Sequence, residues 1–190
     1  MTSVGFWQTL RQSPLQTIHH WQSQRLSWLF FFISAFLLEL CALGFQYIML
    51  LDPCELCVYQ RLAILLLMAA PLLMIISPSN IPLRILGYGV WVSAALYGLN
   101  KAIIQMNGYD TVDFFNATCS FRPSFPLDLP LYEWLPSLFM PTGLCGADDW
   151  HFLTLNMAQW MVIIFGIYLV AAVLCIISSL FCWANKKSTS

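Results

Sequence analysis

Four long runs of apolar residues, separated by shorter polar segments, dominate the hydrophobic pattern of this 190-residue chain. They cover about residues 28–51, 58–77, 84–104 and 156–183. Each run approaches or exceeds the roughly 20 residues that a helix needs to cross the hydrocarbon core of a bilayer. Backbone in lipid has to satisfy its own hydrogen bonds, which favours helices. The pattern therefore predicts an all-α membrane protein, a four-transmembrane-helix bundle that forms a single membrane domain of residues 1–190.

The amino-acid composition is also typical of a membrane protein. Hydrophobic residues make up 59% and charged residues only 9%, whereas a soluble domain has roughly 25% charged residues. The net charge of −1 and the lack of a basic cluster give no reason to expect a nucleic-acid partner. The first run is too long and too far from the N-terminus for a cleavable signal peptide, so we expect an uncleaved anchor.

The charges between the runs predict the orientation in the membrane. With four helices, both termini and the connection at residues 78–83 share one side. The charged residues on that side, including the one at the helix edge, are all cationic: Arg11, Arg25, Arg84, Lys186 and Lys187. Most acids fall on the other side: Asp52, Glu55, Asp110, Asp113, Asp128, Glu133, Asp148 and Asp149. The positive-inside rule therefore places both termini in the cytoplasm and two loops, at about residues 50–57 and 105–155, in the periplasm.

The seven cysteines divide between these loops and the helices. Loop cysteines can meet an oxidising compartment, and they are Cys54, Cys57, Cys119 and Cys145. Cysteines within apolar helices usually behave as small hydrophobic residues, and they are Cys41, Cys175 and Cys182. The four loop cysteines are therefore the candidates for redox chemistry.

Cys54 and Cys57 form a C-x-x-C motif, and the predicted helix start beside it can stabilise a thiolate. A c-type haem site would need a histidine after the second cysteine, where Val58 stands. A zinc site usually has a second closely spaced pair, but 25 residues separate Cys119 from Cys145. We therefore predict neither metal nor haem, while a pair of purely structural disulfides remains an alternative.

Two charged residues fall inside predicted helices. Arg61 lies four residues after Cys57, hence on the same helix face. It could stabilise the Cys57 thiolate and anionic oxygens of a bound acceptor, or it could extend to the lipid headgroups. Glu39 lies near the middle of the first helix, where we favour a hydrogen-bonded acid that fixes helix packing over a functional role.

The segment at residues 127–140 separates Cys119 from Cys145 and is too short and too rich in proline to span a bilayer. Its leucine and aromatic residues predict a segment that lies on the membrane surface. An ordinary apolar loop that packs on the bundle is the alternative.

Short motifs between residues 38 and 150 are shared with one known family: Leu38-Glu39-Leu40, Phe45-Gln46, Pro53-Cys54-Glu55-Leu56-Cys57-Val58-Tyr59-Gln60-Arg61, Pro82-Leu83-Arg84, Ala117-Thr118-Cys119, Glu133-Trp134-Leu135-Pro136 and Gly143-Leu144-Cys145 followed by Trp150. By these motifs the chain resembles the disulfide-bond formation protein B family, DsbB, of Gram-negative bacteria, over about residues 28–180.

The resemblance implies an enzyme of the bacterial inner membrane, a thiol:quinone oxidoreductase. Cys119 and Cys145 would accept electrons from DsbA, a periplasmic thioredoxin-like oxidant, with Cys119 forming the mixed disulfide. Cys54 and Cys57 would be reoxidised by ubiquinone, or by menaquinone without oxygen. Cys57 would contact the quinone, and Arg61 would support it there.

The chain departs from the family pattern at two positions. Relatives carry a histidine near the periplasmic end of the third helix, where Gln105 or Met106 stands here. Gln60 stands where some relatives have glutamate. Two other function classes stay open on the sequence: a scaffold with inert disulfides, and a thiol–quinone protein of the epoxide-reductase type, which the cysteine layout fits less well.

Overall fold

The computed structural model describes residues 14–78, 80–110, 123–143 and 150–188. Its long helices, in chain order, are α3 (Arg25–Tyr47), α4 (Glu55–Ile76), α5 (Ile81–Asp110) and α8 (Met157–Ser188). Shorter elements flank or connect them: α2 (Pro14–Gln22), η1 (Pro126–Asp128), α6 (Leu131–Trp134), α7 (Pro136–Phe139), β1 (His151–Phe152) and β2 (Leu155–Asn156).

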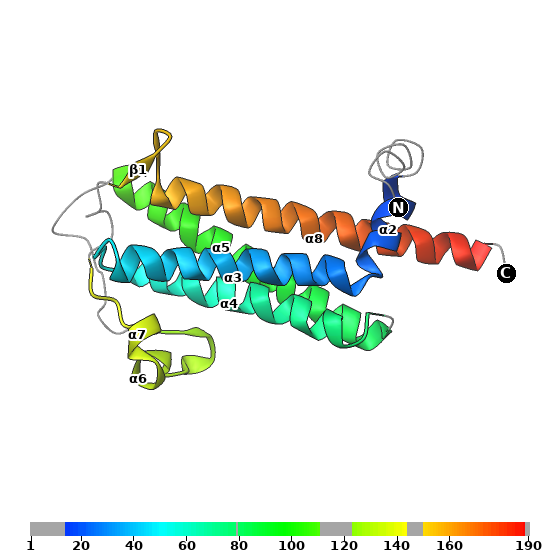
Figure 1. Cartoon of the computed structure of the whole chain (residues 1–190), viewed down its shortest axis with the longest axis horizontal. Coiled ribbons are helices and arrows are strands. Elements are labelled where there is room, and N and C mark those ends of the chain that lie inside the picture. The colour runs from blue at the N-terminus through cyan, green and yellow to red at the C-terminus, as the bar shows by residue number, and fades with distance from the viewer. Residues whose placement is uncertain (1–13, 79, 111–122, 144–149, 189–190) are drawn as a thin grey trace.

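The four long helices lie side by side in one elongated bundle (Figure 1). Helix α4 packs against α3 and α5, and α5 packs in turn against α8. The short elements α6, α7 and the β1–β2 hairpin lie at the end of the bundle where α4 begins (Figure 1), which we call the CxxC end. Helix α2 packs on α8 at the opposite end.

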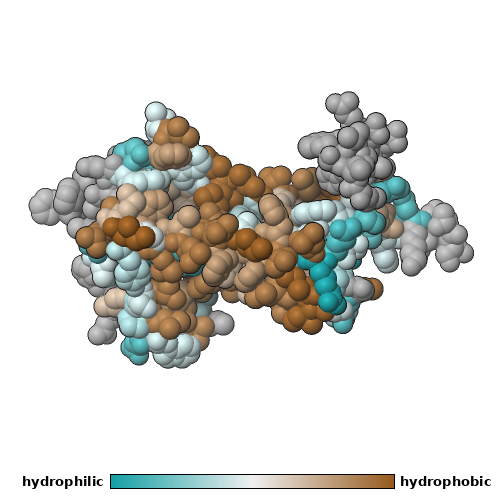
Figure 2. Space-filling model, viewed as in Figure 1, coloured by the Kyte–Doolittle hydropathy of each residue, from teal (hydrophilic) through white to brown (hydrophobic). Residues whose placement is uncertain are grey.

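Three helices in the described part of the chain are long and apolar enough to cross a membrane: α3, α4 and residues Met157–Asn185 of α8. The fourth predicted span, residues 84–104, lies within the 30-residue α5, which is not among the three. The outer surface of the bundle is largely hydrophobic (Figure 2), with large side chains such as Leu37, Ile85 and Ile167 exposed. This arrangement is consistent with an all-α protein that is embedded in a bilayer.

Small residues let the helices approach closely. A Cβ on Gly87 of α5 would lie 2.6 Å from the Cε of Met74 on α4, and one on Gly98 would collide with the ring of Phe165 on α8. The core between them contains Trp28 and Trp91, whose rings meet edge to face with centroids 5.7 Å apart. Close packing of this kind is what holds helices together in lipid, where the hydrophobic effect between them is lost.

The element boundaries differ from the sequence prediction in three places that matter for the site. Helix α5 continues to Asp110, so Gln105 lies in this helix and not in the predicted loop of residues 105–155. The first helix ends at Tyr47 and not near residue 51, and Leu50 in the following loop has a positive φ of 55°. Helix α4 begins at Glu55, so Cys57 lies within the helix and not in the loop. The cause is local, because Pro53 and the extended backbone of Cys54 start the helix earlier than the apolar run suggests.

Candidate functional site

The two cysteines of the C-x-x-C motif meet at the first turn of α4. Cys54 is the N-cap residue, and its Sγ accepts a hydrogen bond from the backbone N–H of Cys57 at 3.3 Å. The two sulfur atoms lie 2.7 Å apart. Cys54 is buried, whereas Cys57 is partly exposed. The motif thus places both sulfurs at the start of α4, where the helix dipole favours negative charge, and it places the Cys54 sulfur where a backbone N–H group points.

Two buried glutamines lie beside these sulfurs, and one of them donates hydrogen bonds to both. The Gln105 amide on α5 donates to Cys57 Sγ at 3.4 Å and to Cys54 Sγ at 3.6 Å. Its own oxygen accepts a hydrogen bond from Gln60 Nε2 at 2.7 Å. Both glutamine side chains are only 3% exposed. Both positions depart from the family pattern, and their contact with the cysteines was not predicted from the sequence.

Arg61 is buried one turn below Cys57. Its NH1 nitrogen donates to Gln46 Oε1 at 2.9 Å and to the Leu138 carbonyl at 2.8 Å. Its Nε lies 3.4 Å from Glu39 Oε1, and the two side chains are 5% and 7% exposed. The Arg61 side chain is therefore buried within the bundle, and Glu39 serves as its counter-ion across the α3–α4 contact. A buried charge needs such a partner.

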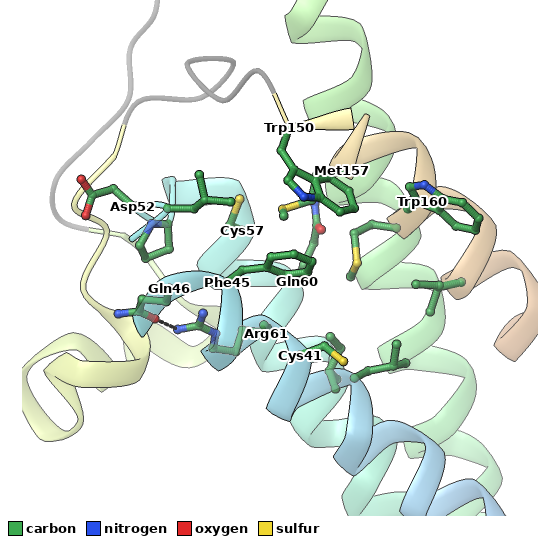
Figure 3. A pocket seen from close by; sticks show the side chains of 17 residues that line it. Cys41, Phe45, Gln46, Asp52, Cys57, Gln60, Arg61, Trp150, Met157 and Trp160 are labelled. Atoms are coloured by element: carbon green, nitrogen blue, oxygen red, sulfur yellow. Dashed lines mark hydrogen bonds between the residues drawn. The ribbon is translucent and has the colours of Figure 1, made fainter. Parts of the chain in front are cut away.

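An apolar cavity of about 210 Å³ opens beside Cys57 and Arg61. In Figure 3, Cys57 stands on one side of it and Trp150 and Trp160 on the other. The walls come from α3, α4, α8 and the loops between them, with almost entirely apolar surface. A second cavity of about 400 Å³ continues along α3 and α8. The two share the wall residues Leu38, Cys41 and Ile164.

The predicted long loop of residues 105–155 is hydrogen-bonded to the predicted short loop of residues 50–57, next to the C-x-x-C motif. The backbone N–H groups of Thr142 and Gly143 donate to the Pro53 carbonyl at 3.0 and 3.1 Å. The Thr142 hydroxyl donates to Asp52 Oδ1 at 2.9 Å. A Cβ on Gly143 would collide with the Asp52 carbonyl oxygen. Only glycine permits this approach, two residues before Cys145 in the sequence.

A second attachment lies nearer to Cys119 in the sequence. The Ser124 N–H donates to the Tyr59 hydroxyl at 2.9 Å, and that hydroxyl donates to Glu55 Oε1 at 2.8 Å. The Tyr59 ring packs edge to face on Phe125, with Lys101 Nζ 4.5 Å from its centroid. One end of the described segment 123–143 thus contacts the first two turns of α4, and the other end contacts the loop just before α4.

The remaining predicted site residues are located as follows. Cys119 and Cys145 lie outside the described residues. Cys175 is buried in the core, Cys182 is partly buried, and Cys41 is exposed on α3, where it lines both cavities. Within the described ranges, no group of three or more His, Cys, Asp or Glu side chains could hold a metal ion.

Comparison with known proteins agrees with the chemistry of this site. The family model described as "Disulfide bond formation protein DsbB" matches residues 24–175. A protein of Sodalis glossinidius (strain morsitans) named Disulfide bond formation protein B is 43% identical over 171 residues, which are 88% of this chain and 94% of that protein. A protein of the same name from Shewanella sp. (strain MR-4) is 45% identical over 164 residues, 86% of this chain and 93% of its own length. One from Shewanella loihica is 40% identical over 166 residues, 87% and 96% of the two chains. The chain belongs to the DsbB family of disulfide bond formation proteins.

Proposed function

We propose that this chain is an inner-membrane thiol:quinone oxidoreductase. It reoxidises a DsbA-like periplasmic dithiol oxidase and passes the electrons through two cysteine pairs to ubiquinone, or to menaquinone without oxygen. The observation that carries the proposal is the position of Cys57, which belongs to a close sulfur pair and lines an apolar cavity together with Arg61. Family membership supports the disulfide-forming role.

The proposed electron path starts at Cys119 and Cys145. Their disulfide would take two electrons from the reduced partner, whose dithiol becomes a disulfide. The resulting dithiol would then reduce the Cys54–Cys57 disulfide by thiol–disulfide exchange, which needs a thiolate and a reachable sulfur. The hydrogen bonds from Thr142 and Gly143 to Pro53 support this step, because they bring the sequence neighbours of Cys145 and Cys54 together.

The cavity fits the ring of a quinone. An apolar protein cavity of roughly 150 Å³ can hold benzene, so about 210 Å³ suffices for one substituted ring. The adjoining cavity along α3 and α8 would take the first part of an isoprenoid tail. A quinone bound there supplies the final acceptor, gaining two electrons and two protons as the Cys54 and Cys57 thiols become a disulfide. Arg61, already fixed by Gln46 and Leu138, would hold positive charge at the cavity wall.

The proposed topology completes the assignment. We infer that α5 is the fourth span, so that residues 1–190 form a single membrane domain with both termini in the cytoplasm and the CxxC end in the periplasm. Segment α6–α7 would lie on the membrane surface. Its exposed apolar side chains, Trp134, Leu135 and Met140, support this placement.

The direct test is quinone reduction by the purified protein in detergent, with a reduced DsbA-like protein as the electron donor. Reduction of a soluble ubiquinone analogue is expected from the wild type and from a protein in which Cys41, Cys175 and Cys182 are replaced by alanine. It is expected to be absent when Cys57 or Cys119 is replaced by alanine. Quinone reduction that survives either single replacement contradicts the proposed path.

A further inference from the structure

The Gln105 amide donates to both sulfurs of the C-x-x-C motif, but the backbone hydrogen bond from the helix start is described only for one of them. Cys54 is the N-cap of α4, so its sulfur receives the backbone N–H of Cys57 from the helix start. The Cys57 sulfur lies one turn further into the helix. Besides the Cys54 sulfur 2.7 Å away, the side chain described as hydrogen-bonded to it is the Gln105 amide on α5, at 3.4 Å. The sulfur that lines the cavity is thus served by a second helix.

The orientation of the Gln105 amide follows from its partner. An amide group can present either its oxygen or its nitrogen to a neighbour. Gln60 donates its N–H to the Gln105 oxygen at 2.7 Å, which turns the Gln105 nitrogen towards both sulfurs. Both side chains are buried, so water competes little for these bonds.

We propose that Gln105 is a further catalytic residue of this chain, which stabilises the thiolate on Cys57, and that Gln60 is the positioning residue that orients its amide. The proposal rests on the proposed function, because it concerns the same disulfide. It adds a neutral hydrogen-bond donor from α5 to a site otherwise built from the helix start and Arg61.

The bonds that form and break show where the donor acts. An incoming thiolate uses its electron pair to form a new S–S bond with one sulfur of the Cys54–Cys57 disulfide. The electron pair of the broken bond stays on the leaving sulfur, which becomes a thiolate without gaining a proton. With Cys54 attacked, this charge develops on Cys57, within reach of the Gln105 N–H groups. Hydrogen bonds to a charged sulfur are stronger than those to a neutral one, so the donor favours this step.

Because its amide is neutral, Gln105 can donate hydrogen bonds independently of pH, which a titrating donor could not do. The Gln105 side chain keeps its N–H groups at every pH at which the protein folds, because an amide does not ionise in that range. An imidazole in its place would gain and lose a proton between about pH 5 and 8. Thiolate stabilisation by Gln105 is therefore the same across the physiological pH range.

The test measures the reactivity of Cys57 and requires neither quinone nor the partner protein. The full-length protein is fully reduced in detergent and treated with iodoacetamide, and alkylation of Cys57 is followed by fragment mass spectrometry. Three variants replace a buried glutamine by methionine, which has similar length and no N–H: Gln105→Met, Gln60→Met and Gln22→Met. Gln22 is the matched control, since it is equally buried and hydrogen-bonded but lies at the α2 end of the bundle.

At pH 7 we expect alkylation of Cys57 to slow about threefold in Gln105→Met. Loss of one hydrogen bond to a charged group lowers the thiolate fraction about tenfold. The less stabilised thiolate is about threefold more nucleophilic, which offsets part of this. Gln60→Met should give a smaller decrease, because the freed amide can still donate part of the time. Gln22→Met should match the wild type.

A fourth variant, Gln105→His, tests the role of the donor itself. Its alkylation rate relative to the wild type should rise as the pH falls through about 6.5, where the imidazole becomes charged. A flat ratio for Gln105→His overturns the proposal, as does an unchanged rate in Gln105→Met or an equal decrease in Gln22→Met. Because quinone reduction is a separate assay, its failure would refute the proposed function without altering these alkylation results.

Discussion

Replacing Gly143 by alanine tests whether the contact between the two loops serves electron transfer. In the structure, a Cβ at this position would collide with the Asp52 carbonyl oxygen and lie 2.9 Å from the Asp52 Cβ. Backbone atoms cannot give way as a flexible side chain can, so the segment at residues 142–143 has to move away from Pro53. Such overpacking usually costs about 1–3 kcal/mol.

The size of the effect follows from the hydrogen bonds at stake. Thr142 and Gly143 each donate a backbone N–H to Pro53, and a typical hydrogen bond contributes about 1 kcal/mol net. Losing both shifts the equilibrium between the attached and detached loop by about 2 kcal/mol, or roughly thirtyfold at 1.4 kcal/mol per factor of ten. If electrons pass from Cys145 to Cys54 only while the loop is attached, their transfer slows by up to this factor.

The assay is stopped-flow mixing of the oxidised protein with a reduced DsbA-like donor, quenched with acid and trapped by alkylation. Formation of the mixed disulfide at Cys119 should keep its rate in Gly143→Ala, while reduction of the Cys54–Cys57 pair should slow at least fivefold. Gly166→Ala is the control, because a Cβ at Gly166 would meet nothing within 4 Å. Equal rates of Cys54–Cys57 reduction in Gly143→Ala and the wild type would refute the reasoning.

Four further predictions follow from the site and the topology. Arg61→Lys keeps the charge but loses the guanidinium that donates to Gln46 and Leu138, so steady-state kinetics should give a higher KM for quinone in this variant. In Arg61→Ala the KM should be about tenfold higher than in the wild type. An unchanged KM in Arg61→Ala would mean that Arg61 is only a structural anchor. Glu39→Leu leaves the Arg61 charge buried without a counter-ion and should lower the free energy of unfolding in detergent by about 3–5 kcal/mol, and a decrease below about 1 kcal/mol would contradict the ion pair. Activity within twofold of the wild type is expected from a folded protein with alanine at all three helix cysteines, Cys41, Cys175 and Cys182, and its loss would mean that one of them takes part. Alkaline phosphatase should be inactive when fused after Lys187 and active when fused at Asp113; the reverse pattern would invert the topology.

The local part of the site could be predicted from the sequence. The sequence predicted a helix start beside the C-x-x-C motif, and the spacing of four residues put Arg61 on the same helix face as Cys57. Both are properties of one helix and depend only on its period. The structure places Cys57 and Arg61 together at one cavity wall.

The contacts between helices could not be predicted in the same way. Helices α3, α4 and α5 carry apolar residues on almost every face, so the sequence does not reveal which face of one helix meets another. For that reason neither the approach of Glu39 to Arg61 nor that of Gln105 to the two sulfurs was predicted, although Glu39 and Arg61 are charged residues in apolar runs and Gln105 directly follows one. The β1–β2 hairpin was missed for a different reason. Its turn residues Leu153 and Thr154 have positive φ values of 50° and 67°, which such side chains rarely adopt, so they give no turn signal.

Burial of polar side chains does not by itself identify the functional end of this bundle. At the α2 end, Gln22 donates to Ser179 and accepts from the Tyr88 hydroxyl, while Arg84 also donates to Ser179. That network is as well connected as the one around Arg61, yet among the described residues it contains no pair of sulfurs and lines neither of the two cavities described above. It fastens α2 and α5 to α8, which is a structural role. At the CxxC end the same residue types surround a sulfur pair and an open apolar cavity, and Arg61 contributes to the wall. An uncharged network would suffice to join helices, so the buried Arg61–Glu39 pair, with its large desolvation penalty, supports the proposed role of Arg61 as a positive charge beside a reducible group.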